Sequence, residues 1–184
     1  MKTVLISINP RWVEKIASGK KTIEVRKTAP KEVPFKAYIY CSYGNDKENY
    51  MLGWRGKVIG EFICDKLTHM QAYRDKNKVL HLTNIDSDTL QKTCLKSYEL
   101  FDYISNRDTH TNVTYNGNLW HISDLKIYDK PKELSEFYTK KKCNSCKKSG
   151  YESIACMYDE DCKVPVAITR PPQSYMYVEE VENE

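Results

Sequence analysis

A run of polar side chains near the N-terminus has the residue types needed for acid–base chemistry or for ligand recognition. Lys21, Thr22, Glu24 and Arg26 lie together within residues 18–26. Strand alternation would place Thr22, Glu24 and Arg26 on one side, with aliphatic residues on the other. A carboxylate here can act as a general base or accept hydrogen bonds from a base amino group, while the cations attract phosphate. The alternative interpretation is a solvated strand face carrying a Glu–Arg pair.

A helix followed by a glycine turn must deliver these side chains. Asn9 is suited to cap a helix with Pro10 at its first position and an end at Ala17. Gly19 can then adopt the left-handed backbone that a helix C-terminus requires. The remaining pattern predicts strands at 2–8, 20–26, 35–41, 57–64, 119–128, 163–168 and 175–181, helices at 86–96 and 99–105, and a helical turn at 134–138.

In the order of several segments, the sequence resembles the ASCH family, a branch of the PUA-like β-barrels. The matching segments are 5–13, 19–26, 35–41, 60–62 and 120–123. Within the family, segments 123–131 and 170–175 resemble small proteins of phages and prophages. The likeness leaves out residues 65–112 and the cysteine-rich insert. It implies an α+β fold: a PUA-like mixed-sheet β-barrel with peripheral helices, formed by one domain over residues 1–184 with a Cys/Lys-rich insert at 140–163.

The resemblance implies binding of RNA, of DNA or of a modified nucleoside in the barrel cleft. Such a cleft needs an aromatic wall, polar groups at its base and cations at its mouth. Trp54 or Trp120 would stack on a base, whereas Trp12 is expected in the core. If Trp120 faces the core, His121 and Ser123 line the cleft. A hydrogen-bonded structural histidine is the alternative for His121.

The proline-rich segment 170–175 is a further candidate for ligand contact. Its two prolines stiffen the turn and hold the flanking side chains in place. Gln173 offers a donor and an acceptor to a base edge, Arg170 can meet phosphate, and Ser174 follows them. The alternative is a rigid entry into the last strand.

Two further functions stay open from the sequence. In the acetylcytidine amidohydrolases of this superfamily a lysine activates a threonine nucleophile. Lys21 matches that lysine, but Glu24 stands where the threonine would be. A hydrolase of a modified nucleoside would therefore use Lys21 and Glu24 as its catalytic residues. The other alternative is a phage or prophage protein that acts by binding a host protein.

Four cysteines in the insert have spacings that suit a structural zinc ion. Cys143 and Cys146 are separated by two residues, and Cys156 and Cys162 follow. Two thiolates at this first spacing can reach one tetrahedral zinc. The alternative is a lysine-rich loop with incidental cysteines. Three other cysteines, at 41, 64 and 94, lie in apolar patterns and are expected in the core.

Composition narrows the class of protein. The net charge of +4 permits a phosphate-bearing partner without requiring one. Asn9 and Pro10 interrupt the first apolar run, and no stretch of about 18 apolar residues occurs, so neither a signal peptide nor a membrane span is predicted. Seven cysteines, an odd number, favour a reduced, cytoplasmic protein.

Overall fold

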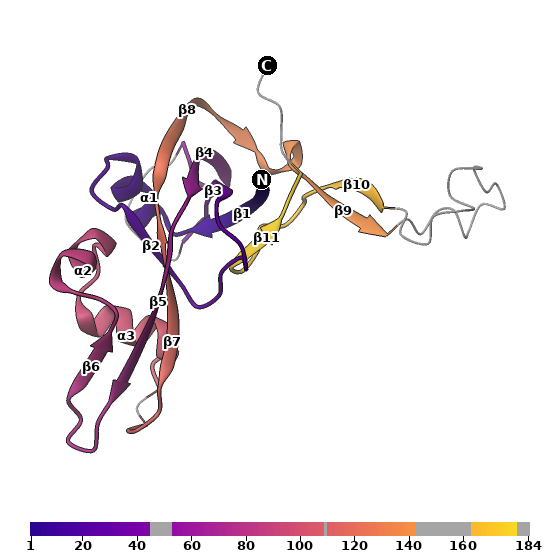
Figure 1. The fold of residues 1–184 in the computed structure, drawn as a ribbon. Coiled ribbons are helices and arrows are strands. Elements are labelled where there is room, and N and C mark those ends of the chain that lie inside the picture. The colour runs from indigo at the N-terminus through magenta and orange to yellow at the C-terminus, as the bar shows by residue number, and fades with distance from the viewer. Residues whose placement is uncertain (45–52, 109, 143–162, 180–184) are drawn as a thin grey trace.

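The computed structural model describes residues 1–44, 53–108, 110–142 and 163–179, which form an α+β fold (Figure 1). The described strands are β1 (Lys2–Ile8), β2 (Ile23–Arg26), β3 (Phe35–Cys41), β4 (Lys57–Cys64), β5 (Leu67–Arg74), β6 (Leu80–Thr83), β7 (Tyr115–His121), β8 (Ser123–Glu133), β9 (Tyr138–Lys142), β10 (Lys163–Ala167) and β11 (Tyr175–Tyr177). The described helices are α1 (Pro10–Ala17), α2 (Ser87–Thr93), α3 (Ser97–Ser105) and the 3-10 turn η1 (Leu134–Glu136). None of the described helices is long and apolar enough to cross a membrane.

Two larger sheets carry the fold. The first has the order β11-β1-β3-β4-β8 and is mixed, because β1 and β3 run parallel while the other neighbours are antiparallel. The second is antiparallel, with the order β2-β7-β5-β6, and β9 and β10 form a separate two-stranded ribbon. The α+β, mixed-sheet architecture implied by the sequence is therefore confirmed.

Strand β1 of the first sheet is buried on both faces, which explains why its sequence alternates only weakly between polar and apolar residues. Val4, Ile6 and Ile8 pack with α1 in one core cluster, whereas Leu5 packs with Phe137 in another on the opposite face. A third cluster lies between the second sheet and helices α2 and α3. In Figure 1 these two helices lie beside β2, β5 and β6.

The helix and turn before β2 form as the sequence predicts. Asn9 Oδ1 accepts a hydrogen bond from the backbone N–H of Arg11 at 3.0 Å, and Pro10 opens α1. Gly19 has a φ of +72°, and its N–H donates to the carbonyl of Ile16 at 2.9 Å. This turn reverses the chain and directs the polar run toward the space between the sheets.

Residues 65–112 differ most from the expectation. They contain the hairpin of β5 and β6, whose turn is fixed by Asp75 Oδ1 accepting from the N–H groups of Asn77 and Val79, both at 2.9 Å. The strand predicted over 119–128 is two strands, because the chain passes from one sheet to the other between His121 and Ser123. Periodicity alone did not reveal this change of sheet.

The cysteines fall into three groups. Cys41 and Cys64 are buried as expected, and burial raises the pKa of their thiols to about 11 and about 12. Cys94 is half-buried rather than in the core, because it ends α2 in a left-handed conformation. The four insert cysteines, residues 143, 146, 156 and 162, lie outside the described residues.

Candidate binding pocket

A buried network of three charged side chains lies at the start of β2. Lys21 Nζ donates to the carbonyl oxygens of Ile23 at 2.8 Å and Thr93 at 2.7 Å, and lies 3.3 Å from Glu24 Oε2. The Lys21 side chain is only 2 % exposed. The polar run is thus not a solvated strand face, and its charges satisfy one another inside the protein.

The surroundings of Lys21 identify it as an ammonium group. Burial lowers the pKa of Lys21, while the charge of Glu24 and its hydrogen bond oppose that effect. An ammonium has three N–H donors, and three acceptors surround this one. A neutral amine would turn its lone pair toward one of them. Lys21 therefore holds Glu24 and the end of α2 in place, and the geometry does not favour it as a proton acceptor.

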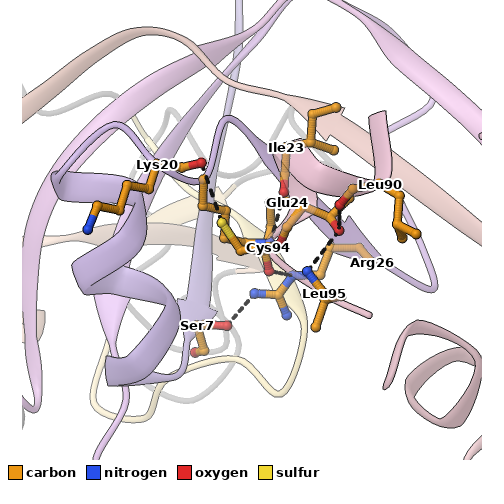
Figure 2. A network of polar contacts seen from close by, with 10 residues as sticks. Ser7, Lys20, Ile23, Glu24, Arg26, Leu90, Cys94 and Leu95 are labelled. Carbon is orange, nitrogen blue, oxygen red and sulfur yellow. Dashed lines mark hydrogen bonds and ion pairs between the residues drawn. The ribbon is translucent and has the colours of Figure 1, made fainter. Parts of the chain in front are cut away.

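Glu24 is held on its other side by Arg26. Arg26 Nε lies 3.1 Å from Glu24 Oε1, although this N–H is not directed along a hydrogen bond to the oxygen. A second nitrogen of the guanidinium donates to the carbonyl of Ser7 on β1 (Figure 2). Among the described residues the buried Nε–H thus has an ion pair but no in-line acceptor.

The connection between α2 and α3 is fastened to the segment that precedes β2. Thr22 N–H donates to the carbonyl of Lys92 at 3.1 Å, and Cys94 Sγ donates to the carbonyl of Lys20 at 3.4 Å. Together with the bond from Lys21 to Thr93, these contacts fix the end of α2 beside β2. Figure 2 shows the contact between Cys94 and Lys20. The charged network is therefore coupled to the helices that lie over it.

A pocket of about 290 Å³ opens above this network. Lys21, Glu24 and Arg26 lie in its lining with the helical side chains of Trp12 and Tyr103. The lining is completed by Ser7, Ile8, Asn9, Val25, Leu95 and Glu99. The pocket thus joins β1, β2, α1, the α2–α3 connection and α3, which are far apart in sequence.

Trp12 provides the aromatic wall that the sequence assigned elsewhere. It was expected in the core, and it does pack against the core cluster around Val13, but it is only half-buried and also lines the pocket. Its ring lies 5.3 Å from Lys21 Nζ, 4.5 Å from the Arg11 guanidinium and 5.2 Å from Lys15 Nζ. The sequence did contain a signal for this aromatic wall. Arg11 stands one residue before this helical tryptophan and Lys15 three residues after it, so both cations can flank its ring.

The two tryptophans expected to stack lie elsewhere. Trp120 is 0 % exposed and packs edge-on against Phe35, with ring centres 4.9 Å apart, and against Tyr175 at 5.5 Å. Trp54 is half-buried against the same core. Neither is in the pocket lining, so neither offers a free face to a base there.

The other polar residues of the predicted cleft make structural contacts. Burial lowers the pKa of His121, whose Nε2 is 3.0 Å from Thr68 Oγ1. Ser123 Oγ donates to the carbonyl of Ile63 at 3.0 Å. The Thr22 side chain is exposed. The structure therefore brings Lys21, Glu24 and Arg26 together in the pocket lining. It leaves Thr22, His121 and Ser123 outside that lining.

The proline-rich turn lies next to the pocket without lining it. Ser7, a pocket residue, donates through Oγ to the carbonyl of Pro172 at 2.6 Å and through its N–H to the carbonyl of Ser174 at 3.3 Å. Arg170 and Gln173 are exposed. The turn thus supports the β1 edge of the pocket.

Tyr103 and Glu99 are pocket residues that the sequence did not reveal. Burial raises the pKa of Tyr103, an effect that Arg26 opposes by its charge. Glu99 Oε1 pairs with Arg11 at 3.6 Å, and its Oε2 accepts from the N–H of Lys96 at 2.9 Å. Both project from α3, which the sequence predicted only as a peripheral helix.

No cluster of three or more histidine, cysteine or acidic side chains among the described residues is arranged to hold a metal ion. The described part of the pocket lining combines the buried ion network with an indole, from Trp12, and a phenol, from Tyr103.

Solved structures share this fold, although no family model matches the sequence and no curated protein matches it significantly. The crystal structure of ASCH from Zymomonas mobilis superimposes with a TM-score of 0.55 at 18% identity, covering 97% of this chain and 89% of that one. A tyrosine-to-phenylalanine mutant of ZmASCH gives a TM-score of 0.53 at 17% identity, covering 98% and 92%. A serine-to-alanine mutant gives 0.53 at 17%, covering 97% and 89%. The chain therefore has the fold of the ASCH proteins.

Proposed function

We propose that this chain binds nucleic acid, RNA foremost, or a modified nucleoside by taking one planar base into the pocket. The observation that carries the proposal is the pairing of an indole face, Trp12, with the buried Glu24–Arg26 pair in one cavity. Aromatic faces hold bases by stacking, and polar groups beneath them read the base edge. A cytoplasmic site of action, predicted from the cysteine usage, belongs to the same proposal.

Size and charge favour a base over a phosphate inside the pocket. A volume of about 290 Å³ lies just below the range for small-molecule sites, about 300–1,000 Å³, and is therefore suited to a small ligand such as a single base. Two cations, Lys21 and Arg26, are balanced by two carboxylates, Glu24 and Glu99. Such a lining suits a neutral polar ring. Phosphate attraction, assigned to Lys21 and Arg26 from the sequence, fits better with Arg11 and Lys15 beside Trp12.

The buried pair supplies one donor and one acceptor to the ligand. Arg26 lies in the pocket lining, and its buried Nε–H, which has no in-line acceptor among the described residues, would donate to a carbonyl oxygen or ring nitrogen of the ligand if the guanidinium turned toward the pocket. Each oxygen of Glu24 has more than one lone pair, so each can accept from a base N–H while keeping its present ion pair. Lys21 and the carbonyl of Ser7 hold the pair in position before any ligand arrives.

The hydrolase alternative receives less support from the geometry. Its lysine would have to accept a proton, whereas Lys21 directs its donors at three acceptors. Glu24 could still activate a water molecule. Turnover of an acetylated cytidine distinguishes the hydrolase from the binding protein. If the chain is instead a phage-type protein that blocks a host factor, no nucleoside is expected to bind in the pocket.

The proposal is tested by calorimetric titration with neutral nucleosides and with short RNA and DNA oligonucleotides, each at two salt concentrations. We expect nucleoside binding to be nearly independent of salt, because the pocket charges are balanced, and oligonucleotide binding to weaken with salt. Absence of binding by every nucleoside and oligonucleotide would contradict the proposal. Release of acetate from an acetylated cytidine would instead establish the hydrolase.

We also propose that the cysteine-rich segment holds a structural zinc ion. The register of β9 and β10 pairs Lys142 with Lys163, the two described residues that flank residues 143–162 in the chain. Cys143 and Cys162 directly adjoin this pair in sequence. We expect about one zinc per chain after purification without chelator, and loss of the metal in a Cys143→Ser/Cys146→Ser variant. A metal content near zero in the wild-type protein would refute the zinc site.

A further inference from the structure

A second hollow, of about 550 Å³, adjoins the pocket. The two share Glu99 and Tyr103, which lie one helical turn apart on α3, so a molecule bound in the first can extend over this helix into the second. The remaining lining residues of the second hollow are Lys27, Asp102, Asn106 and Arg107. Its polar lining contrasts with the indole-walled pocket beside it.

The lining of the second hollow contains two cations, Lys27 and Arg107. Lys27, which directly follows β2, donates to Asn106 Oδ1 and has its Nζ 5.3 Å from the centre of the Tyr103 ring. Arg107 is exposed, and its left-handed backbone, with a φ of +61°, turns the chain away from the end of α3. Both cations therefore lie in the segments that border the hollow.

The helix side of the hollow carries the opposite charge. Asp102 lies in the last turn of α3, where the free carbonyl groups of a helix add partial negative charge. Glu99 is already paired with Arg11 and caps α3 through Lys96 N–H. Phosphate is disfavoured next to Asp102, whereas hydroxyl groups, which donate hydrogen bonds, fit there.

We propose that this hollow binds the sugar–phosphate that follows the base in an RNA strand, with Asp102 accepting a hydrogen bond from a ribose hydroxyl and Lys27 and Arg107 meeting the phosphate. This inference rests on the proposed function, because it requires a base in the first pocket. Carboxylates are established partners of ribose hydroxyls, and the 2′-hydroxyl is the group by which a protein distinguishes RNA from DNA. The preferred ligand is then a ribonucleotide within a strand.

The cationic edge is tested with the double variant Lys27→Ala/Arg107→Ala. For a short single-stranded RNA, loss of one or two phosphate contacts should reduce the slope of log affinity against log salt by about 0.7 per contact. Affinity for a neutral nucleoside should not change. Lys76→Ala/Lys78→Ala removes the same charge from the exposed β5–β6 turn and is expected to leave the slope almost unaltered. Equal effects of the two double variants would overturn the inference.

The ribose contact is tested with Asp102→Ala and a pair of oligonucleotides that differ only in their 2′-hydroxyl groups. Wild type should bind the RNA several-fold more tightly than the matched DNA, and the variant should lose this preference through weaker RNA binding alone. An unchanged preference would overturn the ribose assignment. Failure of the proposed function is a different result from failure of the ribose assignment: in that case nucleosides would not bind to the wild-type protein at all.

Discussion

Replacing Lys21 with methionine is expected to lower the free energy of unfolding by about 3–5 kcal/mol, the usual effect of removing one partner from a buried ion pair. The change removes the Lys21 donor from the carbonyls of Ile23 and Thr93. Among the residues that the structure describes, it leaves Glu24 with Arg26 as its one charged partner. Methionine retains most of the volume of the lysine side chain, so the loss of stability reports the lost charge and hydrogen bonds. The change in the free energy of unfolding is measured by urea unfolding followed by circular dichroism.

Lys20→Met is the matched control for this experiment. Lys20 precedes Lys21 in the chain, but its side chain is exposed. A surface change of this kind is expected to shift the free energy of unfolding by no more than about 0.5 kcal/mol. If the two variants unfolded at the same urea concentration, the buried network would not contribute the stability that its geometry implies.

Replacing Trp12 with leucine is expected to weaken binding of a base by about 1–3 kcal/mol, or roughly 5- to 150-fold in affinity. Leucine preserves the apolar contact of α1 with the core but has no aromatic face. Because Trp12 is half-buried and lies at the pocket wall, the effect on binding should exceed the effect on folding. Calorimetric titration with the tightest nucleoside gives the affinity, and thermal unfolding checks that the variant is folded.

Trp54→Leu provides the matched control for stacking. Trp54 is also half-buried against the same core cluster, yet it does not line the pocket. Its loss should destabilise the fold and leave the dissociation constant of the nucleoside unchanged. If Trp54→Leu weakened binding while Trp12→Leu did not, the base would have to bind at a different surface.

The strands and helices whose boundaries are marked by neighbouring residues could be predicted from the sequence. Strands β3 and β4 begin and end where their apolar patterns do, and α1 starts at the cap and proline that mark it. These features depend on neighbouring residues, which the sequence shows directly. The hairpin of β5 and β6 escaped notice because its strands are polar on one face and its second strand has only four residues.

The pocket could be predicted only in part, because its two sides come from distant segments. The polar run of β2 was found, but a strand face that carries Lys, Glu and Arg looks the same in sequence whether it is solvated or buried. Lys21 is buried through its contact with Thr93, which is 72 residues away. Glu99 and Tyr103 belong to the part of the chain without a resemblance to a known family, so nothing connected them with β2.

The indole N–H signals of the protein provide the most direct test that a base enters the pocket. The chain has three tryptophans, and one of them, Trp12, lines the pocket while Trp54 and Trp120 do not. In an NMR titration of labelled protein with a bound nucleoside, the Trp12 indole signal and the Arg26 Nε–H signal should shift the most, with Trp54 unchanged. A nucleoside that binds yet leaves the Trp12 and Arg26 signals in place would contradict the proposed pocket.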